Sequence, residues 1–301
     1  RLMIEITGTV IVTGANGFLG RHICLSLLKE GFEVIAIVRR SQNMVDNLAS
    51  QYSRLKILVF DLVLANESLP NLPRPPIALV HAAGLDATST SDFRPNITMA
   101  RVVSLIACRM KIPCVVNISS QNVTFLKRGT YASSKLITER VFEEVLNDCI
   151  IHTLRPTLIY DDSGNKFLEQ LVCLGRRVRM VPLLGLKDPK LQPVHASDVA
   201  SIVTQLVTHG VAETHEISGA TTIGLHEIAK AISRHVIAIP IPIPYFFLKF
   251  FGFVVRGFSE KVFELYENKT LDSDEVSFLQ SRFGRDFRSF KEDLPKILEQ
   301  M

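Results

Sequence analysis

Short runs of apolar residues alternate with amphipathic stretches over the first half of the chain. The runs that predict strands are continuously apolar, and they lie at residues 9–13, 33–38, 56–60, 78–81, 114–118 and 150–154. Strands without polar alternation are typical of a sheet that is buried on both faces, because the helices between the strands cover it. The pattern therefore predicts an α/β fold with a doubly wound parallel sheet.

The rhythm changes after about residue 160. Short apolar pieces at 179–184, 192–195 and 215–218 are separated by helical patterns at 197–208 and 225–235. This favours a second, smaller mixed domain. We expect a first domain over 1–165 and a second over 166–301, with the alternative that the sixth-strand region and residues 190–220 return to the first.

Composition narrows the class of protein. The chain has 301 residues, of which 47% are hydrophobic, and a formal net charge of +4, which excludes a disordered chain and indicates no nucleic-acid partner. Its five cysteines and eight histidines form no C-x-x-C, H-E-x-x-H or other metal-ligand spacing, so we expect no metal site. Residues 2–12 lack a signal-peptide pattern, and free thiols fit a reducing compartment, so we expect a cytoplasmic protein.

A second apolar feature, residues 237–258, needs its own interpretation. Pro240, Pro242 and Pro244 exclude a helix over its first part, and the remainder is too short for a spanning helix, which needs about 20 residues. We expect a proline-marked strand that leads into an apolar helix, packed on the core. A lipid-facing surface or a wall for an apolar substrate is the alternative.

The segment from Thr13 to Gly20 reads TGANGFLG and separates the first strand from the first helix. A chain that turns sharply beside a pyrophosphate needs glycine, which has no Cβ, and the helix N-terminus offers unpaired N–H groups to the anion. The alternative is an ordinary tight turn between strand and helix. The strand–loop–helix unit predicts a Rossmann-type dinucleotide-binding domain.

The spacing G-x-x-G-x-x-G resembles the short-chain dehydrogenase/reductase superfamily, in its extended or atypical branch, the NAD-dependent epimerase/dehydratase family. The resemblance is dense up to Asp198. It implies cofactor-binding roles for the loop, for the Asp-hydrophobic pair after the third strand and for the small residues after the fourth: Gly14, Asn16, Gly17, Phe18, Leu19, Gly20, Asp61, Leu62, Ala82, Ala83 and Gly84.

Arg39 and Arg40 end the second strand, where an enzyme that prefers NAD usually has an acidic residue. An arginine instead suits the 2′-phosphate of NADP, so we expect NADP as the preferred cofactor, with NAD as the alternative. The competing interpretation is that both arginines only solvate a surface loop.

Tyr131 and Lys135 are four residues apart and so share one face of a helix. The resemblance implies that Tyr131 is the general acid/base, that Lys135 lowers its pKa and binds the nicotinamide ribose, and that Ser120 orients the substrate hydroxyl. Ser119 is the alternative to Ser120. Asn96 either supports the lysine or caps a helix.

The second half of the chain adds structural expectations. The resemblance implies that backbone at Pro156 faces the nicotinamide. The resemblance also implies a substrate contact by Asn165, at a place where the family's Gly-Pro turn is replaced by residues 161–165, DDSGN. His195 reads either as a catalytic base or, by the resemblance, as a structural anchor, with Asp198 capping the following helix.

These features together predict a nicotinamide-dependent epimerase or reductase that acts at a carbinol or carbonyl carbon, with a nucleotide sugar as the substrate class. No acidic residue lies beside Ser120, which disfavours a dehydratase. The alternatives are a sterol-dehydrogenase-like reductase of a lipophilic alcohol and a non-catalytic accessory subunit that keeps the cofactor. The resemblance also implies a homodimer formed through paired helices.

Overall fold

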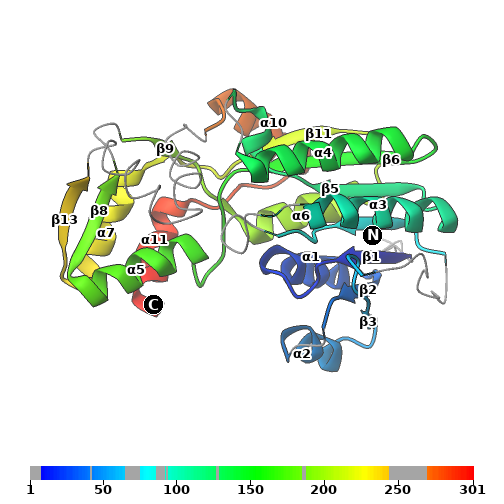
Figure 1. Cartoon of the computed structure of the whole chain (residues 1–301), viewed down its shortest axis with the longest axis horizontal. Coiled ribbons are helices and arrows are strands. Elements are labelled where there is room, and N and C mark those ends of the chain that lie inside the picture. The colour runs from blue at the N-terminus through cyan, green and yellow to red at the C-terminus, as the bar shows by residue number, and fades with distance from the viewer. Residues whose placement is uncertain are drawn as a thin grey trace. The chain divides into compact units, whose positions relative to one another are not determined.

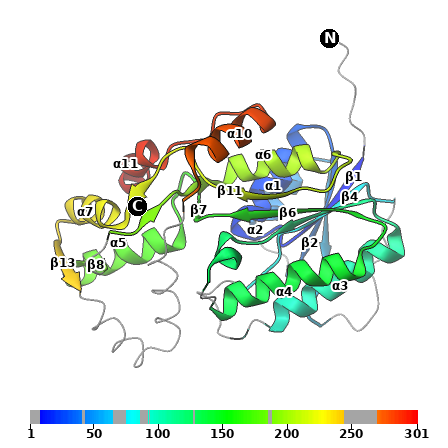
Figure 2. The same ribbon diagram turned by 90° about the horizontal axis from the view of Figure 1, so that it is seen from above.

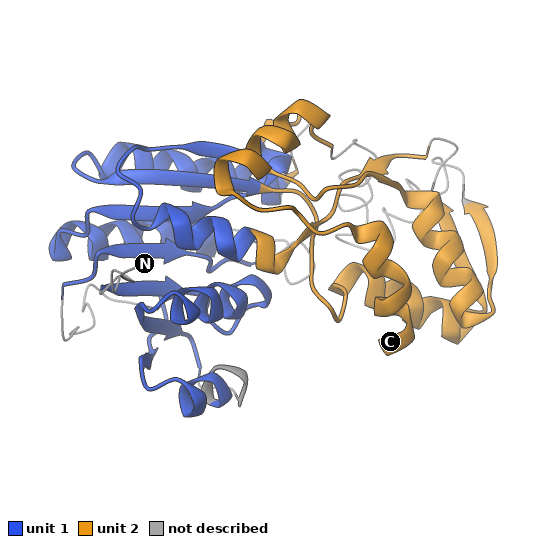
Figure 3. Ribbon diagram, turned by 180° about the vertical axis from the view of Figure 1, so that it is seen from behind, with its two compact units in different colours: residues 1–123, 130–155, 199–215 blue, residues 124–129, 156–198, 216–301 orange. Residues whose placement is uncertain are grey.

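The structure is a computed structural model, and it describes residues 8–40, 43–64, 75–85, 92, 94–126, 129–184, 188–243 and 270–301. The chain folds into two compact units, each of which makes most of its contacts within itself (Figure 3). Unit 1 comprises residues 1–123, 130–155 and 199–215. Unit 2 comprises residues 124–129, 156–198 and 216–301.

A seven-stranded parallel sheet forms the centre of unit 1 (Figure 1). Its strand order is β3-β2-β1-β4-β5-β6-β11, which is the doubly wound order of a Rossmann-type sheet. The strands are β1 (Thr9–Thr13), β2 (Glu33–Val38), β3 (Leu55–Val59), β4 (Ala78–His81), β5 (Cys114–Ile118), β6 (Ile150–Pro156) and β11 (Thr214–Ile217).

Helices cover both faces of this sheet, with α3 and α4 on one face and α1 and α6 on the other (Figure 2). Because of this cover, every residue of β1, β4 and β5 is buried. The core under α3 and α4 joins Ile11 and Leu79 of the sheet to Val103 and Phe142 of the helices. The helices of this unit are α1 (Phe18–Lys29), α2 (Asn43–Gln51), α3 (Arg94–Met110), η1 (Gln121–Thr124), α4 (Thr130–Val145) and α6 (Ala196–Leu206).

The predicted doubly wound parallel sheet is confirmed. Four strands have the predicted bounds; β3 begins and ends one residue earlier than expected, and β6 continues to Pro156. Residues 215–218 were assigned to the second domain, with a return of residues 190–220 to the first as the alternative. In the structure, β11 pairs with β6 at the edge of this sheet, where the amide of Thr153 donates to the carbonyl of Glu213 (2.9 Å). A four-residue strand is too short to reveal its partner from sequence.

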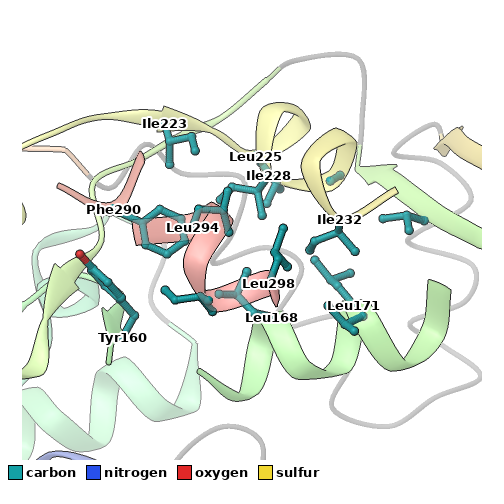
Figure 4. Packing of buried hydrophobic residues seen from close by; sticks show 14 of the residues in the cluster. Tyr160, Leu168, Leu171, Ile223, Leu225, Ile228, Ile232, Phe290, Leu294 and Leu298 are labelled. Atoms are coloured by element: carbon teal, nitrogen blue, oxygen red, sulfur yellow. The ribbon is translucent and has the colours of Figure 1, made fainter. Parts of the chain in front are cut away.

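The described residues of unit 2 form three two-stranded sheets and four helices around a separate core (Figure 4). Tyr160, Phe290 and Leu294 lie in this core. The strands pair as β7 (Ile159–Tyr160) with β10 (Val194–His195), β9 (Lys190–Leu191) with β12 (Ile223–Gly224), and β8 (Met180–Leu184) with β13 (Ile239–Ile243). The helices are α5 (Lys166–Val178), α7 (Leu225–Val236), α10 (Ser273–Phe283) and α11 (Phe290–Gln300).

The proline-marked strand expected after residue 237 is β13, which pairs in parallel with β8. Pro240 and Pro242 lack a backbone N–H, and a two-stranded sheet accepts them because each strand has an open edge. Residues 244–258, where an apolar helix is expected, lie outside the described residues. Within the described part of the chain, no helix combines the length and apolar character needed to cross a bilayer. All five cysteines are free thiols.

Candidate active site

The glycine loop connects β1 to α1 at the carboxyl end of the sheet. Gly14 has a φ of +69°, and a Cβ there would lie 2.7 Å from the backbone of Ala83. The amide of Gly17 donates to the carbonyl of Gly14 (2.8 Å), which closes the loop. Gly17 caps α1 without any side-chain hydrogen bond, so the first-turn N–H groups of this helix remain available to an anion.

Asn16 fixes the position of the next turn. Its Nδ2 donates to the carbonyl of Arg40 (2.9 Å), which ties the end of β2 to the glycine loop. Arg39 and Arg40 are exposed beside this contact. No local sequence pattern marks this tether, because it joins two turns that are 24 residues apart.

A cavity of about 300 Å³ lies along the carboxyl ends of β1, β2 and β3. Its lining includes Gly14, Arg39, Asp61, Leu62 and Ala83, five of the residues expected to bind a cofactor. The Asp61 Oδ1 also accepts hydrogen bonds from two backbone amides, those of residues 63 (2.8 Å) and 64 (3.3 Å), which orients its carboxylate.

A buried histidine that sequence reasoning did not single out supports this loop region. His81 Nδ1 lies 3.0 Å from Thr13 Oγ1, which also accepts from the amide of Ala83 (3.3 Å). Burial, together with the charge of Lys135, lowers the pKa of His81 to about 3, so its ring is neutral. The His81 and Phe142 rings pack in a T-shaped arrangement, with the ring centroids 5.5 Å apart.

Lys135 is buried, and its ammonium reaches the end of β5. Nζ donates to the carbonyl of Ile118 (2.9 Å), two residues before Ser120. Burial lowers the pKa of Lys135 to about 8, although the charge of Glu139 partly opposes this. A Cβ on Gly84 would lie 3.2 Å from Nζ, so a glycine at that position leaves room for the ammonium.

Asn96 does not cap a helix, and its support of Lys135 stays a prediction. It is the third residue of α3, and its Oδ1 accepts from the amide of Leu85 (2.8 Å) while its Nδ2 donates to Ser134 Oγ (3.3 Å). It therefore connects the loop after β4 to α4 and does not cap its own helix. The sequence did not reveal this, because the two partners, Leu85 and Ser134, come from separate elements.

Tyr131 and Ser120 are both half-buried. Tyr131 is in the first turn of α4, one helical turn before Lys135. Ser120 precedes η1, and its Oγ accepts from the amide of Asn122 (3.3 Å). The Oγ of Ser119 is buried, and no residue in the described part of the chain bonds to it.

In unit 2, His195 belongs to a closed network. Its Nδ1 accepts from the amide of Ser197 (3.1 Å) at the start of α6, and its Nε2 lies 3.0 Å from the Arg288 guanidinium. The Arg288 guanidinium also pairs with Asp162 (2.7 Å) and Asp293 (3.0 Å). This network supports the structural interpretation of His195.

The expectation that Asp198 caps α6 is wrong. Its two carboxylate oxygens accept from Arg285 Nε (2.8 Å) and from the amide of Arg288 (2.9 Å), and His195 makes the contact with the first turn of α6 instead. The sequence could not show this, because both partners of Asp198 lie nearly ninety residues further on.

Two further residues of unit 2 were considered from the sequence. Asn165 caps α5, with its Oδ1 accepting from the amide of Leu168 (3.0 Å) and its Nδ2 donating to the carbonyl of Ile159 (3.1 Å). Pro156 is buried at the end of β6. Among the residues that the structure describes, no three His, Cys, Asp or Glu side chains gather in a way that suits a metal ion.

The fold and the glycine loop define the class as the extended short-chain dehydrogenase/reductase superfamily. A model of the "NAD dependent epimerase/dehydratase family" matches residues 10–218, which is more than half of the chain. The chain therefore belongs to this family and is an enzyme of it.

Three similar proteins illustrate the range of the family. The chain is 24% identical over 243 residues to the "Spore coat polysaccharide biosynthesis protein SpsK" of Bacillus subtilis, covering 74% of this chain and 77% of the relative. It is 27% identical over 200 residues to the "Ceramide reductase" of Caulobacter vibrioides, covering 65% of this chain and 60% of that protein.

The third similarity is to a solved structure, UDP-glucuronic acid 4-epimerase from Bacillus cereus in complex with UDP-glucuronic acid and NAD. It aligns over 97% of this chain and 98% of the epimerase, with a TM-score of 0.74 and 18% identity. At this identity the likeness shows a shared fold.

Proposed function

We propose that the enzyme transfers hydride at a carbinol or carbonyl carbon of a nucleotide sugar, as a reductase or epimerase, with NADP(H) preferred over NAD(H). The observation that carries this proposal is the buried Lys135, whose ammonium is held at the end of β5 one helical turn from Tyr131. The likeness to an epimerase solved with a UDP-sugar and NAD supports the substrate class.

The residues around the glycine loop fit a dinucleotide. The contact that a Cβ on Gly14 would make with Ala83 indicates a cradle that only backbone can line. We assign the phosphates to Gly14, Asn16, Gly17, Phe18, Leu19 and Gly20, the adenosine side to Arg39, Asp61 and Leu62, and the nicotinamide side to Ala82, Ala83, Gly84, Tyr131, Lys135 and Pro156. The bound nicotinamide supplies the hydride donor or acceptor.

The roles of the three catalytic residues follow from charge and position. Tyr131 moves the proton of the substrate hydroxyl, and Ser120 donates a hydrogen bond to the same oxygen. The Lys135 ammonium favours the phenolate form of Tyr131 through its positive charge. In the proposed domain arrangement, residues 1–165 bind the cofactor, and residues 166–301 supply the remaining substrate contacts.

The direct test is Tyr131→Phe, with Tyr52→Phe as a matched control on a half-buried tyrosine at the end of α2. Tyr131→Phe is expected to lower kcat by about 10³-fold, within the range for general acid/base residues, while NADPH still binds. Turnover is measured with a panel of UDP-, GDP- and dTDP-sugars. Stoichiometric oxidation of NADPH identifies a reductase, whereas unchanged NADPH with sugar conversion identifies an epimerase. Unchanged turnover in Tyr131→Phe would reject the mechanism.

The preference for NADP rests on Arg39, which is exposed and lines the cavity near the end of β2. A guanidinium there favours a 2′-phosphate, and an acidic residue would favour a ribose 2′-hydroxyl. Arg39→Asp is expected to weaken NADPH binding more than tenfold and to leave NADH binding nearly unchanged, with Arg101→Asp as the control. Tight binding of NADH without NADPH by the unaltered enzyme would overturn the preference.

A second candidate function is the reduction of a lipophilic alcohol or its ketone. The similarity to a ceramide reductase favours this candidate, as does the apolar composition of residues 237–258. The same turnover assay, with a sterol and a long-chain amino alcohol presented in micelles, separates the two substrate classes.

A homodimer through α3 and α4 is part of the proposal. Three apolar side chains on these helices, Leu105, Ile137 and Val145, are 41–43% exposed, which is typical of a surface that a second copy covers. Light scattering during size exclusion measures the mass of the assembly.

A further inference from the structure

The C-terminal ends of α5 and α7 lie side by side in unit 2, next to the start of β8 and β13 (Figure 1). The Arg179 guanidinium donates to the carbonyl of Val236 (2.9 Å), and the amide of Ile239 donates to the carbonyl of Arg179 (2.9 Å). Met180 and Ile239 are partners in the parallel register of the two strands. The two helix-to-strand turns therefore form one continuous surface.

Four apolar side chains stand exposed on this surface. Ile237 is 82% exposed and Ile239 is 67% exposed, while Met180 and Val178 are exposed by 43% and 42%. We name these four residues the apolar tip. A cluster of large apolar side chains in water is uncommon on a protein surface and is typical of a binding face.

Ile237 is also in an unusual backbone conformation. It follows α7 with a φ of +52°, in the left-handed region, where glycine is usual and a β-branched residue is strained. Its side chain packs into no core, since it is almost fully exposed. Neither the turn geometry nor the fold of unit 2 accounts for an isoleucine at this position, and a surface role does.

Cations flank the apolar tip. Arg176, Arg177 and Arg234 are exposed in the last turns of α5 and α7. Residues 173–184 and 228–243 together contain five Lys or Arg and no Asp or Glu. The acidic side chains of Glu227 and Asp188, on neighbouring segments, pair with lysines 291 (3.7 Å) and 190 (2.8 Å). Glu169 lines the same cavity as Arg176 and Arg177, and Glu299 lines the same cavity as Arg234. The five cations outnumber these two carboxylates, so the surface at the tip is apolar with a net positive charge.

We propose that the apolar tip and its flanking arginines dock on an anionic phospholipid surface. Apolar side chains gain free energy in the headgroup–acyl boundary, and each nearby cation gains from the negative surface potential. A bilayer offers both without a complementary pocket, which suits aliphatic side chains that protrude from two turns. Aromatic anchors, which dominate protein–protein interfaces, are absent from residues 173–184 and 228–243.

The base of the tip is closely packed, so the surface is preformed. A Cβ on Gly175 would lie 2.7 Å from the Val236 side chain and 3.0 Å from the Val181 side chain. Only a glycine allows α5 and α7 to approach this closely. Docking of a preformed surface loses little conformational entropy, which favours binding.

The test is co-sedimentation of the full chain with vesicles of phosphatidylcholine alone and of phosphatidylcholine mixed with phosphatidylglycerol. We expect binding to the mixed vesicles, weakened by high salt. Replacing two arginines together, Arg176→Ala with Arg177→Ala, is expected to lower the partition coefficient about 30-fold. Lys29→Ala with Lys56→Ala, two exposed lysines of unit 1, is the matched control and should change nothing.

A second variant separates docking from folding. Ile237→Gly removes the side chain but relieves the left-handed backbone, so we expect unchanged or higher thermal stability and about a tenfold weaker partition. Val211→Ser, at a valine that is 66% exposed in unit 1, is its control. Equal binding to both vesicle types would overturn the proposal. So would binding at the level of the unaltered protein by Ile237→Gly and by the double arginine variant. Self-association that Ile237→Gly abolishes, without vesicle binding, would also overturn it and assign the tip to a second copy.

Discussion

Two polar clusters, one in each unit, differ in how completely their charges are paired. In unit 2, the Arg288 guanidinium contacts Asp162, Asp293 and His195, and Asp293 also accepts from the Tyr160 hydroxyl (2.9 Å). In unit 1, the Lys135 ammonium donates to one backbone carbonyl. On the same strand as that carbonyl, the Asn117 amide is buried, and no described residue bonds to it.

The difference separates a structural cluster from a reactive one. Burial opposes the ionisation of Asp293, but its hydrogen bonds from Arg288 and Tyr160 outweigh burial and hold its pKa below the usual range, so the network stays ionised and closed. Lys135 instead has its pKa lowered to about 8 by burial, so its charge is costly to the fold. A buried charge that costs stability is typical of a catalytic residue, and a charge that is fully paired is typical of a structural residue.

The largest expected effect is on turnover. Lys135→Met removes the charge that favours the Tyr131 phenolate. We therefore expect kcat/KM to fall by about 10³-fold, which is the size of effect seen when general acid/base catalysis is lost. Lys29→Met, at an exposed lysine of α1, is the control and should keep full activity. Steady-state kinetics on the substrate found in the sugar panel measures this, and a loss of less than tenfold would contradict the role of Lys135.

The next effect is on stability at alkaline pH. The pKa of Lys135 is about 8 in the folded state against 10.5 unfolded. Between these values the unfolded chain binds more protons, so the free energy of unfolding rises with pH, by about 3 kcal/mol in total. Urea unfolding at pH 7.5 and pH 10.5 measures the rise. Lys135→Met is expected to lack this rise. Subtracting its change in the free energy of unfolding from that of the unaltered protein cancels the contribution of all other titrating groups. Parallel pH profiles for both proteins would contradict the prediction.

A smaller stability effect is expected in unit 2. Asp198→Asn removes the charge that pairs with Arg285. It also places an NH2 group, which is a donor, against one of the two donors that Asp198 accepts from, Arg285 Nε or the amide of Arg288. Because Asp198 is fully buried while Arg285 can reach water, we expect a loss of about 2 kcal/mol in the free energy of unfolding. Chemical denaturation measures this loss. The control is Asp286→Asn, in the loop that holds Arg285 and Arg288. An unchanged unfolding midpoint would mean that the network is not a stabilising one.

The same contrast explains what the sequence could predict. The strands of unit 1 are readable because burial on both faces makes them continuously apolar, as in residues 34–38 of β2. The hydrogen-bond partners of Thr13, Asn16 and Asn96 could not be predicted, since these partners come from other elements of the fold. In unit 2, strands of two residues such as β9 and β12 carry no periodic signal. The role of Asp198 depends on arginines that only the folded chain brings near it.

The comparison is tested most directly by measuring kcat/KM for Lys135→Met and Asp198→Asn at neutral pH, where both are folded. The account predicts that Lys135→Met loses about 10³-fold in kcat/KM with undiminished stability, while Asp198→Asn keeps kcat/KM within about threefold despite its lower stability. The opposite result, an active Lys135→Met and an inactive but folded Asp198→Asn, would move the reactive centre to unit 2 and contradict the account.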